Sequence, residues 1–451
     1  MKGSGPPISH PFLTRPHRTL VALTWPVLLS LIAEPLAGVA DTAFVARLGP
    51  VELAALGIST TLLSGIFWVF AFLGIGAQTE LARALGAGRT ERARSTSGLV
   101  VGLALLIGTL VAALSLPLLP ATARLMGADL AIEPVAVTYL RIRLLGLPGS
   151  LLLGACFGVL RGLQDMRSPL RVAAVVSGLN VVLDPILIFG LGPLPALGVA
   201  GAAWATALTQ WLGGIWALLI VRRALGLSFD ASVRDAVRLL VVGRDLFLRT
   251  GLLLLFLFLA TRTATQAGAD SGAAHQALRQ IWLLTALLLD SYAAVAQSLI
   301  GYFLGADKIG PARRVASVAC GWGFATGVAL AVGMLLLEGP FESLLVPRSS
   351  RSLFAAAWWI AALAQPINAL SFVTDGIHWG TGDYRYLRNG MLAATTLGGL
   401  GLLLIDPGGE GTVTLVWSIT AAWTAVRSGI GLVRIWPAPG RSPLRQVREV
   451  G

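Results

Sequence analysis

Two aspartates, Asp41 and Asp184, each interrupt a long apolar run of the sequence. Asn180 and Asp184 are four residues apart, so a helix places both side chains on one face, and Pro185 follows directly. Because Pro185 has no N–H to donate to Val181, a free carbonyl oxygen is expected beside the two side chains. These oxygen ligands suit a proton or a sodium ion better than a transition metal.

The segment that carries Asp41 has the features of a helix that can bend. Pro26 and Pro35 each remove one helical hydrogen bond and clash with the preceding turn. Glu34 and Asp41 are seven residues apart and therefore lie on one helix face. Asp41 is either an ion or proton site, as expected for an acid at membrane depth, or an interfacial acid that caps a helix.

Further polar residues are placed to face the pair Asn180 and Asp184. Thr206 and Gln210 are again four residues apart and share one helix face. Together these side chains predict a cluster of oxygen ligands in the first half of the chain. The alternative is a polar network that is satisfied internally and only fixes helix packing.

The second half of the chain holds other polar residues inside apolar runs. Arg279 and Asp290 are eleven residues apart, so they are not expected to pair directly, and Arg427 is an alternative partner for Asp290. Arg249 is expected to extend to the cytoplasmic interface, and a histidine placed like His275 is more often structural than a proton relay. The residues that we expect to line a substrate cavity are Glu34, Gln210, His275, Gln276, Arg279, Trp282, Asp290 and Arg427.

The elements that must position these residues are transmembrane helices. Hydrophobic residues make up 55% of the chain and charged residues 12%, and the mean hydropathy is +0.78. Apolar runs of about 20 residues recur, and runs of this length cross a bilayer as helices because a tilted barrel strand is much shorter. The fold class is therefore all-α and integral to a membrane, and the first run is a span and not a cleaved signal. The predicted spans are 20–45, 52–80, 97–119, 134–159, 169–191, 197–221, 237–261, 272–303, 314–337, 352–377, 389–405 and 412–435.

The net charge of +12 reflects membrane topology and does not indicate a nucleic-acid partner. Lysine and arginine concentrate in alternate loops, which is the positive-inside pattern and places both termini in the cytoplasm. Cys156 and Cys320 both fall within predicted spans, where a free cysteine behaves as a small apolar residue.

The two halves of the sequence resemble each other at an offset of about 219 residues: Ala77 and Gln78 match Ala296 and Gln297. Six spans in each half return the chain to its starting side, which predicts two six-helix lobes related by a pseudo-twofold axis along the membrane normal. Asp41 and Asp184 have no acidic counterpart in the second half. The predicted parts are a cytoplasmic tail 1–19, a first lobe 20–221, a linker 222–236, a second lobe 237–436 and a basic cytoplasmic tail 437–451.

Several segments resemble the multidrug and toxic compound extrusion (MATE) transporters, in the DinF-like branch. The segments that carry the resemblance are Glu34–Gly49, Gly86–Gly88, Asn180–Pro185, Gly201–Thr206, Ala273–Gln276, Leu289–Asp290, Ala296–Gln297 and Leu304–Asp307. The resemblance implies twelve helices in two lobes, and export of organic, often cationic or amphipathic, compounds by antiport with protons or sodium. It also implies that Asp41, Asn180, Asp184 and Thr206 form the coupling cluster, and that the first span bends at Pro26.

The implied mechanism needs no cofactor. Burial disfavours a charged carboxylate, so Asp41 or Asp184 would take a proton from outside, and the first span would then shift and release substrate outward. Sodium would use the same oxygens. The expected partners are a small organic substrate and membrane lipid, and the expected form is a monomer in a bacterial inner membrane.

Arg279, Arg427 and Ser291, where glycine is expected after Asp290, depart from the family pattern and leave the substrate open. A flippase for lipid-linked intermediates would need a basic cavity, to which the two arginines are suited. A narrow organic-anion exporter of the same fold would use them for a carboxylate. An intramembrane enzyme is the remaining alternative, but the sequence holds no nucleophile elbow, phosphate loop or zinc-spaced histidine pair.

Overall fold

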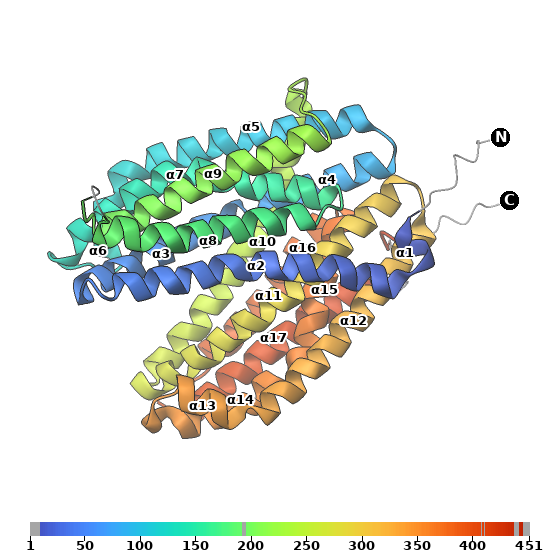
Figure 1. Cartoon of the computed structure of the whole chain (residues 1–451). Coiled ribbons are helices and arrows are strands. Elements are labelled where there is room, and N and C mark those ends of the chain that lie inside the picture. The colour runs from blue at the N-terminus through green and yellow to red at the C-terminus, as the bar shows by residue number, and fades with distance from the viewer. Residues whose placement is uncertain (1–9, 192–194, 407, 410, 437–441, 445–451) are drawn as a thin grey trace, which may run out of the picture. The chain divides into compact units, whose positions relative to one another are not determined.

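The computed structural model describes residues 10–191, 195–406, 408–409, 411–436 and 442–444. Within these ranges the regular structure is helical (Figure 1). Residues 1–9 of the predicted first tail, and all of the predicted last tail except 442–444, lie outside the described residues. The helices are α1 (Pro11–Thr14), α2 (Pro16–Val45), α3 (Pro50–Phe70), α4 (Phe72–Gly86), α5 (Thr90–Ser115), η1 (Leu116–Leu118), α6 (Leu119–Leu125), α7 (Ile132–Gly162), α8 (Arg167–Phe189), α9 (Val199–Ala224), α10 (Val233–Gln266), α11 (Ala269–Gly305), α12 (Ile309–Leu336), α13 (Glu338–Leu345), η2 (Arg348–Ser350), α14 (Arg351–Leu363), α15 (Gln365–Thr381), α16 (Tyr384–Leu403) and α17 (Thr412–Ile435).

The twelve predicted spans all fall on these helices, so the all-α membrane class is confirmed. Among the described residues, eight helical segments are long and apolar enough to cross a membrane, and a bent pair makes a ninth. That pair, Arg348–Leu363 and Gln365–Thr381, bends by 50° inside the predicted span 352–377. The bend comes just before Pro366, which lacks the N–H needed to continue the preceding helix.

The chain divides into two compact units, which we call the N-terminal unit (residues 26–247) and the C-terminal unit (residues 1–25 and 248–451). These boundaries differ from the predicted lobes 20–221 and 237–436 and from the predicted linker 222–236. They fall inside two helices, α2 and α10, each of which therefore runs from one unit into the other.

Contacts within each unit explain where these boundaries fall. In the N-terminal unit, α10 approaches α4 so closely that a side chain added at Gly243 would meet the Phe72 ring. In the C-terminal unit, Trp322 Nε1 donates to His17 Nδ1 at 3.1 Å, which ties the start of α2 to α12. The sequence could not reveal either contact, because each joins segments that are far apart along the chain.

The centre of the N-terminal unit is α7, which lies beside α9 (Figure 1). Small residues allow the close approach: a Cβ atom at Gly146 would lie 2.9 Å from Cα of Ala207. In membranes such small residues let helix backbones pack closely where longer side chains would hold them apart. This packing fixes α9 next to α7, and Thr206 directly precedes the contact residue Ala207.

The centre of the C-terminal unit is α11, which packs closely against α15. A Cβ atom at Gly376 of α15 would collide with the backbone of Ala293 in α11. Apolar side chains fill the remaining interior, among them Trp282, Phe354 and Trp358. Asp375 of α15 is thereby held inside this unit, next to the close contact at Gly376.

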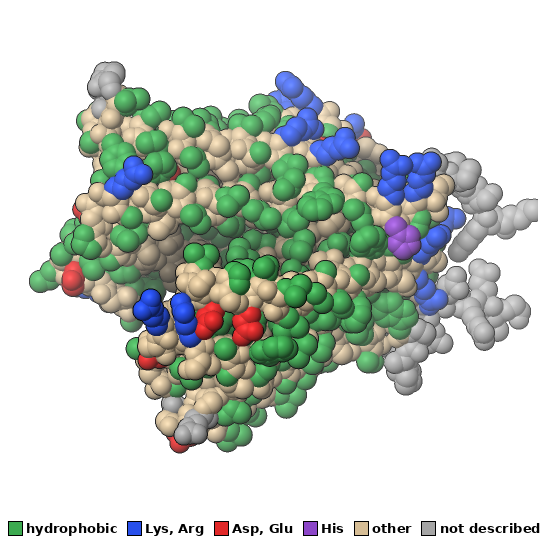
Figure 2. All heavy atoms as spheres, turned by 60° about the horizontal axis from the view of Figure 1, so that its bottom comes forward, with side chains coloured by type: hydrophobic (Ala, Val, Ile, Leu, Met, Phe, Trp, Pro, Cys, Tyr) green, Lys and Arg blue, Asp and Glu red, His purple; other side chains and the backbone are tan. Residues whose placement is uncertain are grey.

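Large apolar side chains remain exposed along the helices of both units. Figure 2 shows hydrophobic side chains over much of the visible face. Leu36, Leu114, Leu208 and Leu397 are all more than 40% exposed. A soluble protein rarely leaves apolar patches of this extent in water, so the surface is suited to lipid.

Candidate ion-coupling site

Three helices of the N-terminal unit bring the four predicted coupling residues together. Asp41 comes from α2, Asn180 and Asp184 from α8, and Thr206 from α9. The side-chain amide of Asn180 donates to Thr206 Oγ1 at 3.3 Å, and Thr206 Oγ1 lies 3.5 Å from Asp41 Oδ2. Asp184 is fully buried, and Asp41 and Asn180 are 9% and 4% exposed, so water contributes little to the solvation of these groups.

The cluster is rich in acceptor oxygens and poor in donors. Thr206 Oγ1 also lies 3.1 Å from the carbonyl oxygen of Ala202, and its single proton can serve only one of these acceptors at a time. Asp41 Oδ1 and both carboxylate oxygens of Asp184 are buried and accept no hydrogen bond from the described residues. A buried carboxylate without donors is unstable unless a proton or a cation supplies the missing interaction.

The carboxyl groups of Asp41 and Asp184 are also within interaction distance of each other. Two carboxylates that face each other at low dielectric cannot both remain charged without a shared proton or a bound cation. The geometry therefore suits reversible binding of a proton or a small monovalent cation, as the residue types alone predicted.

The three prolines lie inside the helices that carry Asp41 and Asp184. Pro26 and Pro35 are inside α2, which continues as one helix through both, and Pro185 is inside α8 directly after Asp184. Pro26 is also the first residue of the N-terminal unit. A missing backbone hydrogen bond at that position lowers the cost of bending α2 where the two units meet along the chain.

Two residues of α7 that sequence reasoning missed lie beside the cluster. Tyr139 is 2% exposed and lies within electrostatic reach of Asp41 and Asp184. Arg143, one turn further along the helix, interacts with the Tyr139 hydroxyl and is 7% exposed. The signal was available, because a tyrosine and an arginine four residues apart share one face of the predicted span 134–159.

The two predicted cavity residues of the N-terminal unit differ in exposure. Gln210 lies one turn after Thr206 on α9 and is 8% exposed, and its Oε1 atom has no donor among the described residues. Glu34 is an exposed residue of α2 that lies within electrostatic reach of Arg143. Both lie on helices that carry predicted coupling residues.

The predicted cavity residues on α11 do not share one environment. His275 is buried, with Nε2 at 3.2 Å from Thr261 Oγ1 and its ring beside Trp417, which suits a structural histidine. Arg279 Nη1 donates to Gln276 Oε1 at 3.2 Å. Trp282, which was expected to line a cavity, lies in the apolar core of the unit. Its large ring is buried there against other apolar side chains.

One expectation about the arginines of the C-terminal unit is wrong. Arg249 does not extend to an interface: it is 9% exposed and pairs with Asp375. Arg427 pairs with the same carboxylate at 2.9 Å, and the charge of Asp290 also acts on it. Asp375 was missed, even though it is an acid inside the predicted span 352–377, because its partners lie on α10 and α17.

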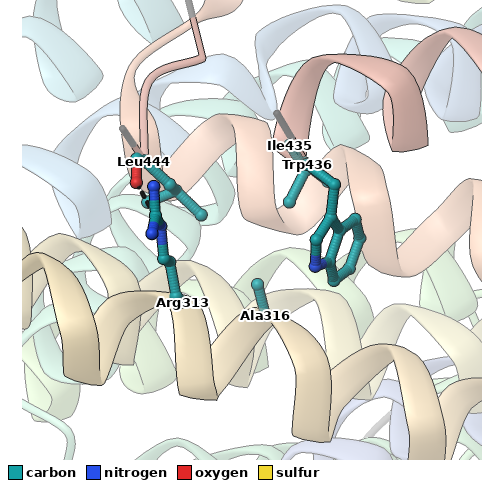
Figure 3. Close-up of a pocket in the computed structure, with 5 residues that line it drawn as sticks. All are labelled: Arg313, Ala316, Ile435, Trp436 and Leu444. Carbon is teal, nitrogen blue, oxygen red and sulfur yellow. Dashed lines mark hydrogen bonds between the residues drawn. The ribbon is translucent and has the colours of Figure 1, made fainter. Parts of the chain in front are cut away.

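A small pocket lies elsewhere in the C-terminal unit, beside α12 (Figure 3). Its lining residues are Arg313, Ala316, Ile435, Trp436 and Leu444. Arg313 Nε donates to the carbonyl oxygen of Leu444, which holds the described part of the last segment against α12. None of the predicted site residues lines this pocket.

Comparison with known proteins agrees with the resemblance seen in the sequence. The family model MatE matches residues 26–186 and 247–399. The chain is 32% identical to "Protein DETOXIFICATION 44, chloroplastic" of Arabidopsis thaliana, over 86% of this chain and 76% of the relative. It is 30% identical to "DNA damage-inducible protein F" of Escherichia coli (strain K12), over 94% of this chain and 93% of the relative.

A solved structure described as the outward-facing conformation of a multidrug resistance MATE family transporter of the MOP superfamily has the same fold. It superimposes with a TM-score of 0.85 at 23% identity and covers 93% of this chain and 94% of its own. The predicted two-lobe architecture is therefore confirmed at the level of the fold. From the family match, the relatives and the fold together, this chain belongs to the MATE family of multidrug and toxic compound transporters.

Proposed function

We propose that this chain is a secondary active exporter that moves organic cations or amphipathic compounds out of the cell in exchange for protons or sodium ions. The observation that carries the proposal is the pair of buried carboxyl groups, Asp41 and Asp184, with three of their four oxygens lacking a donor among the described residues. Burial of such a pair is costly while both groups are charged and becomes less costly when an ion binds. Ion binding can therefore shift the protein between two states, and antiport requires such a shift.

The mechanism follows from the helices that carry the cluster. When Asp41 or Asp184 is neutralised, the cost of enclosing the two carboxyl groups falls, so the enclosed arrangement of α2, α8 and α9 becomes favoured. Pro26 allows α2 to bend without breaking a backbone hydrogen bond. Ion and substrate then favour different states of one protein, which is sufficient for antiport.

The alternative of a lipid flippase has less support from the geometry. It depended on Arg279 and Arg427 facing a basic cavity. Arg427 is instead buried and paired with Asp375, which removes one of the two basic groups from consideration. We also propose that the chain acts as a monomer in the bacterial inner membrane with both termini in the cytoplasm and without a cofactor.

Efflux of ethidium from pump-deficient cells tests the proposed function. Cells that express the wild-type chain should lose ethidium fluorescence several times faster than control cells, and cells that express D184N or D41N at equal level should not. A collapse of the proton gradient, or removal of sodium, should stop wild-type efflux and identify the coupling ion. Wild-type efflux rates in both variants would contradict the proposal.

A further inference from the structure

Asp375 of α15 is held by arginines from two other helices of the C-terminal unit. Arg427 Nη2 of α17 donates to Asp375 Oδ2 at 2.9 Å, and Arg249 Nη2 of α10 donates to the same oxygen. The exposed fractions are 5% for Asp375, 9% for Arg249 and 6% for Arg427. Two guanidinium groups thus converge on one carboxylate that has little access to water.

Aromatic rings hold the two arginines in place. The guanidinium carbon of Arg427 lies 4.5 Å from the centre of the Trp423 ring and 6.0 Å from that of Phe372. The guanidinium carbon of Arg249 lies 5.6 Å from the centre of the Trp379 ring. A cation is attracted to the face of an aromatic ring, most strongly where water is excluded. Both positive charges are therefore fixed features of this unit.

The charges around Asp375 are balanced. Asp290 of α11 lies within electrostatic reach of Arg427, so two arginines and two aspartates sum to zero. A further cation would meet repulsion from both guanidinium groups and would have to displace one of them from Asp375. The Asp41 and Asp184 carboxyl groups are the opposite case, because three of their oxygens have no donor among the described residues.

We propose that Arg249 and Arg427 are specificity-determining residues of the exporter. They act as fixed cations at Asp375 and so confine the coupling ion and cationic substrates to the cluster of Asp41 and Asp184. This inference rests on the proposed function, because it concerns which unit takes part in cation exchange. It implies that removal of both arginines uncovers a second cation site that the wild-type chain lacks.

The test is cation binding to purified protein, measured with radioactive sodium and with tetraphenylphosphonium. The parent variant D41N/D184N should bind neither cation. Addition of R249M/R427M should restore binding of at least one of them, with about tenfold or more cation bound than by the parent at the same concentration. The matched control, which adds D375N to those four substitutions, should lose this binding again. A folded R249M/R427M protein in this background that binds no cation would overturn the inference.

A charge-neutral replacement provides the second arm, in case the R249M/R427M variant does not fold. R249M/D290N/D375N/R427M removes two positive and two negative charges, and such exchanges of a whole buried ionic group are often tolerated. With Asp41 and Asp184 intact, this variant should bind both cations with wild-type Kd and stoichiometry. Loss of cation binding in the folded variant would show that Asp375 or Asp290 is itself a cation ligand.

The outcomes separate this inference from the proposed function. Binding is measured without transport, so wild-type protein that binds cation at Asp41 and Asp184 but exports nothing contradicts only the exporter assignment. Wild-type protein that exports ethidium, while D41N/D184N still binds cation through Asp375, contradicts only the role of the two arginines.

Discussion

Three buried aspartates of this chain show how surroundings decide what a carboxyl group can do. One carboxylate oxygen of Asp375 accepts hydrogen bonds from two arginines. Asp41 has one weak contact from Thr206, and Asp184 accepts no hydrogen bond from the described residues. A carboxylate with fixed partners contributes to structure, whereas one without them responds to ions. The residue type is the same, and only the neighbouring helices differ.

The substitution Asp184→Asn should separate function from stability. Because Asp184 is fully buried beside Asp41, removal of its charge relieves a cost of the folded state. We expect the melting temperature in detergent at neutral pH to stay equal or to rise, while ethidium efflux is lost. A melting temperature that falls by about 5 °C or more would show that the carboxylate is a structural element.

Tyr139→Phe should slow transport without loss of folding. The substitution removes one hydroxyl from beside Asp41 and Asp184 and preserves the ring. One such polar interaction is worth about 1 kcal/mol, so we expect efflux to fall about fivefold. The measurement is the initial efflux rate at matched expression, and Tyr302→Phe in the C-terminal unit is the control that should leave this rate unchanged.

The sequence was sufficient to predict that Asn180, Asp184 and Thr206 lie close to Asp41, but not that Tyr139 lies beside them. Asn180 and Asp184 share a face by simple spacing, so their proximity follows from the helix period. Tyr139 lies on a helix that spacing could not connect to them. Asp375 is separated along the chain from Arg249 by 126 residues and from Arg427 by 52 residues. A pattern within one helix cannot predict contacts between residues so far apart in the sequence.

At the scale of helices, the contact between α7 and α9 positions the site. Gly146 leaves no room for a side chain against Ala207, and Thr206 lies next to that contact. Any change that separates the two helices therefore shifts the backbone that carries Thr206. The close contact thus links packing in the N-terminal unit to the geometry of the coupling cluster.

Gly146→Ala tests this link. The new methyl group would lie 2.9 Å from Cα and Cβ of Ala207, so the helices must separate, and we expect a loss of about 1–3 kcal/mol in stability and slower efflux. Gly102→Ala on α5 is the matched control, because its new methyl group meets nothing within 4 Å. The control should keep or slightly raise the melting temperature through better helix propensity.

At the scale of the whole molecule, the class of the helices and their places along the sequence could be predicted, but the division into units could not. Hydropathy locates helices because the bilayer fixes their length. It does not show that a unit boundary falls inside α2 and inside α10, since neither helix is interrupted there. The charged segment 222–236 looked like a linker, yet α10 already begins at Val233 within it.

Movement between the two units should depend on the coupling cluster. Spin labels at L130C and L344C, in a C156A/C320A background, report one exposed position in each unit. We expect their distance distribution to change when the pH is lowered or sodium is added, and to stay constant in D41N/D184N. A pair within the N-terminal unit, L130C and L197C, should show no change. Equal responses with and without the aspartates would contradict the coupling model.

The pairing of Arg249 and Arg427 with Asp375 also bears on how the protein is made. The ribosome completes Arg249 126 residues before Asp375, whereas Arg427 follows Asp375 by 52 residues. Each arginine at the centre of a membrane helix opposes insertion by roughly 3 kcal/mol. During synthesis α17 therefore enters a bilayer that already contains Asp375, the counter-charge of Arg427. The helix α10 enters before Asp375 has been made, so Arg249 has no counter-charge at that stage. The insertion machinery must hold α10, or leave it near the lipid headgroups, until α15 has been delivered.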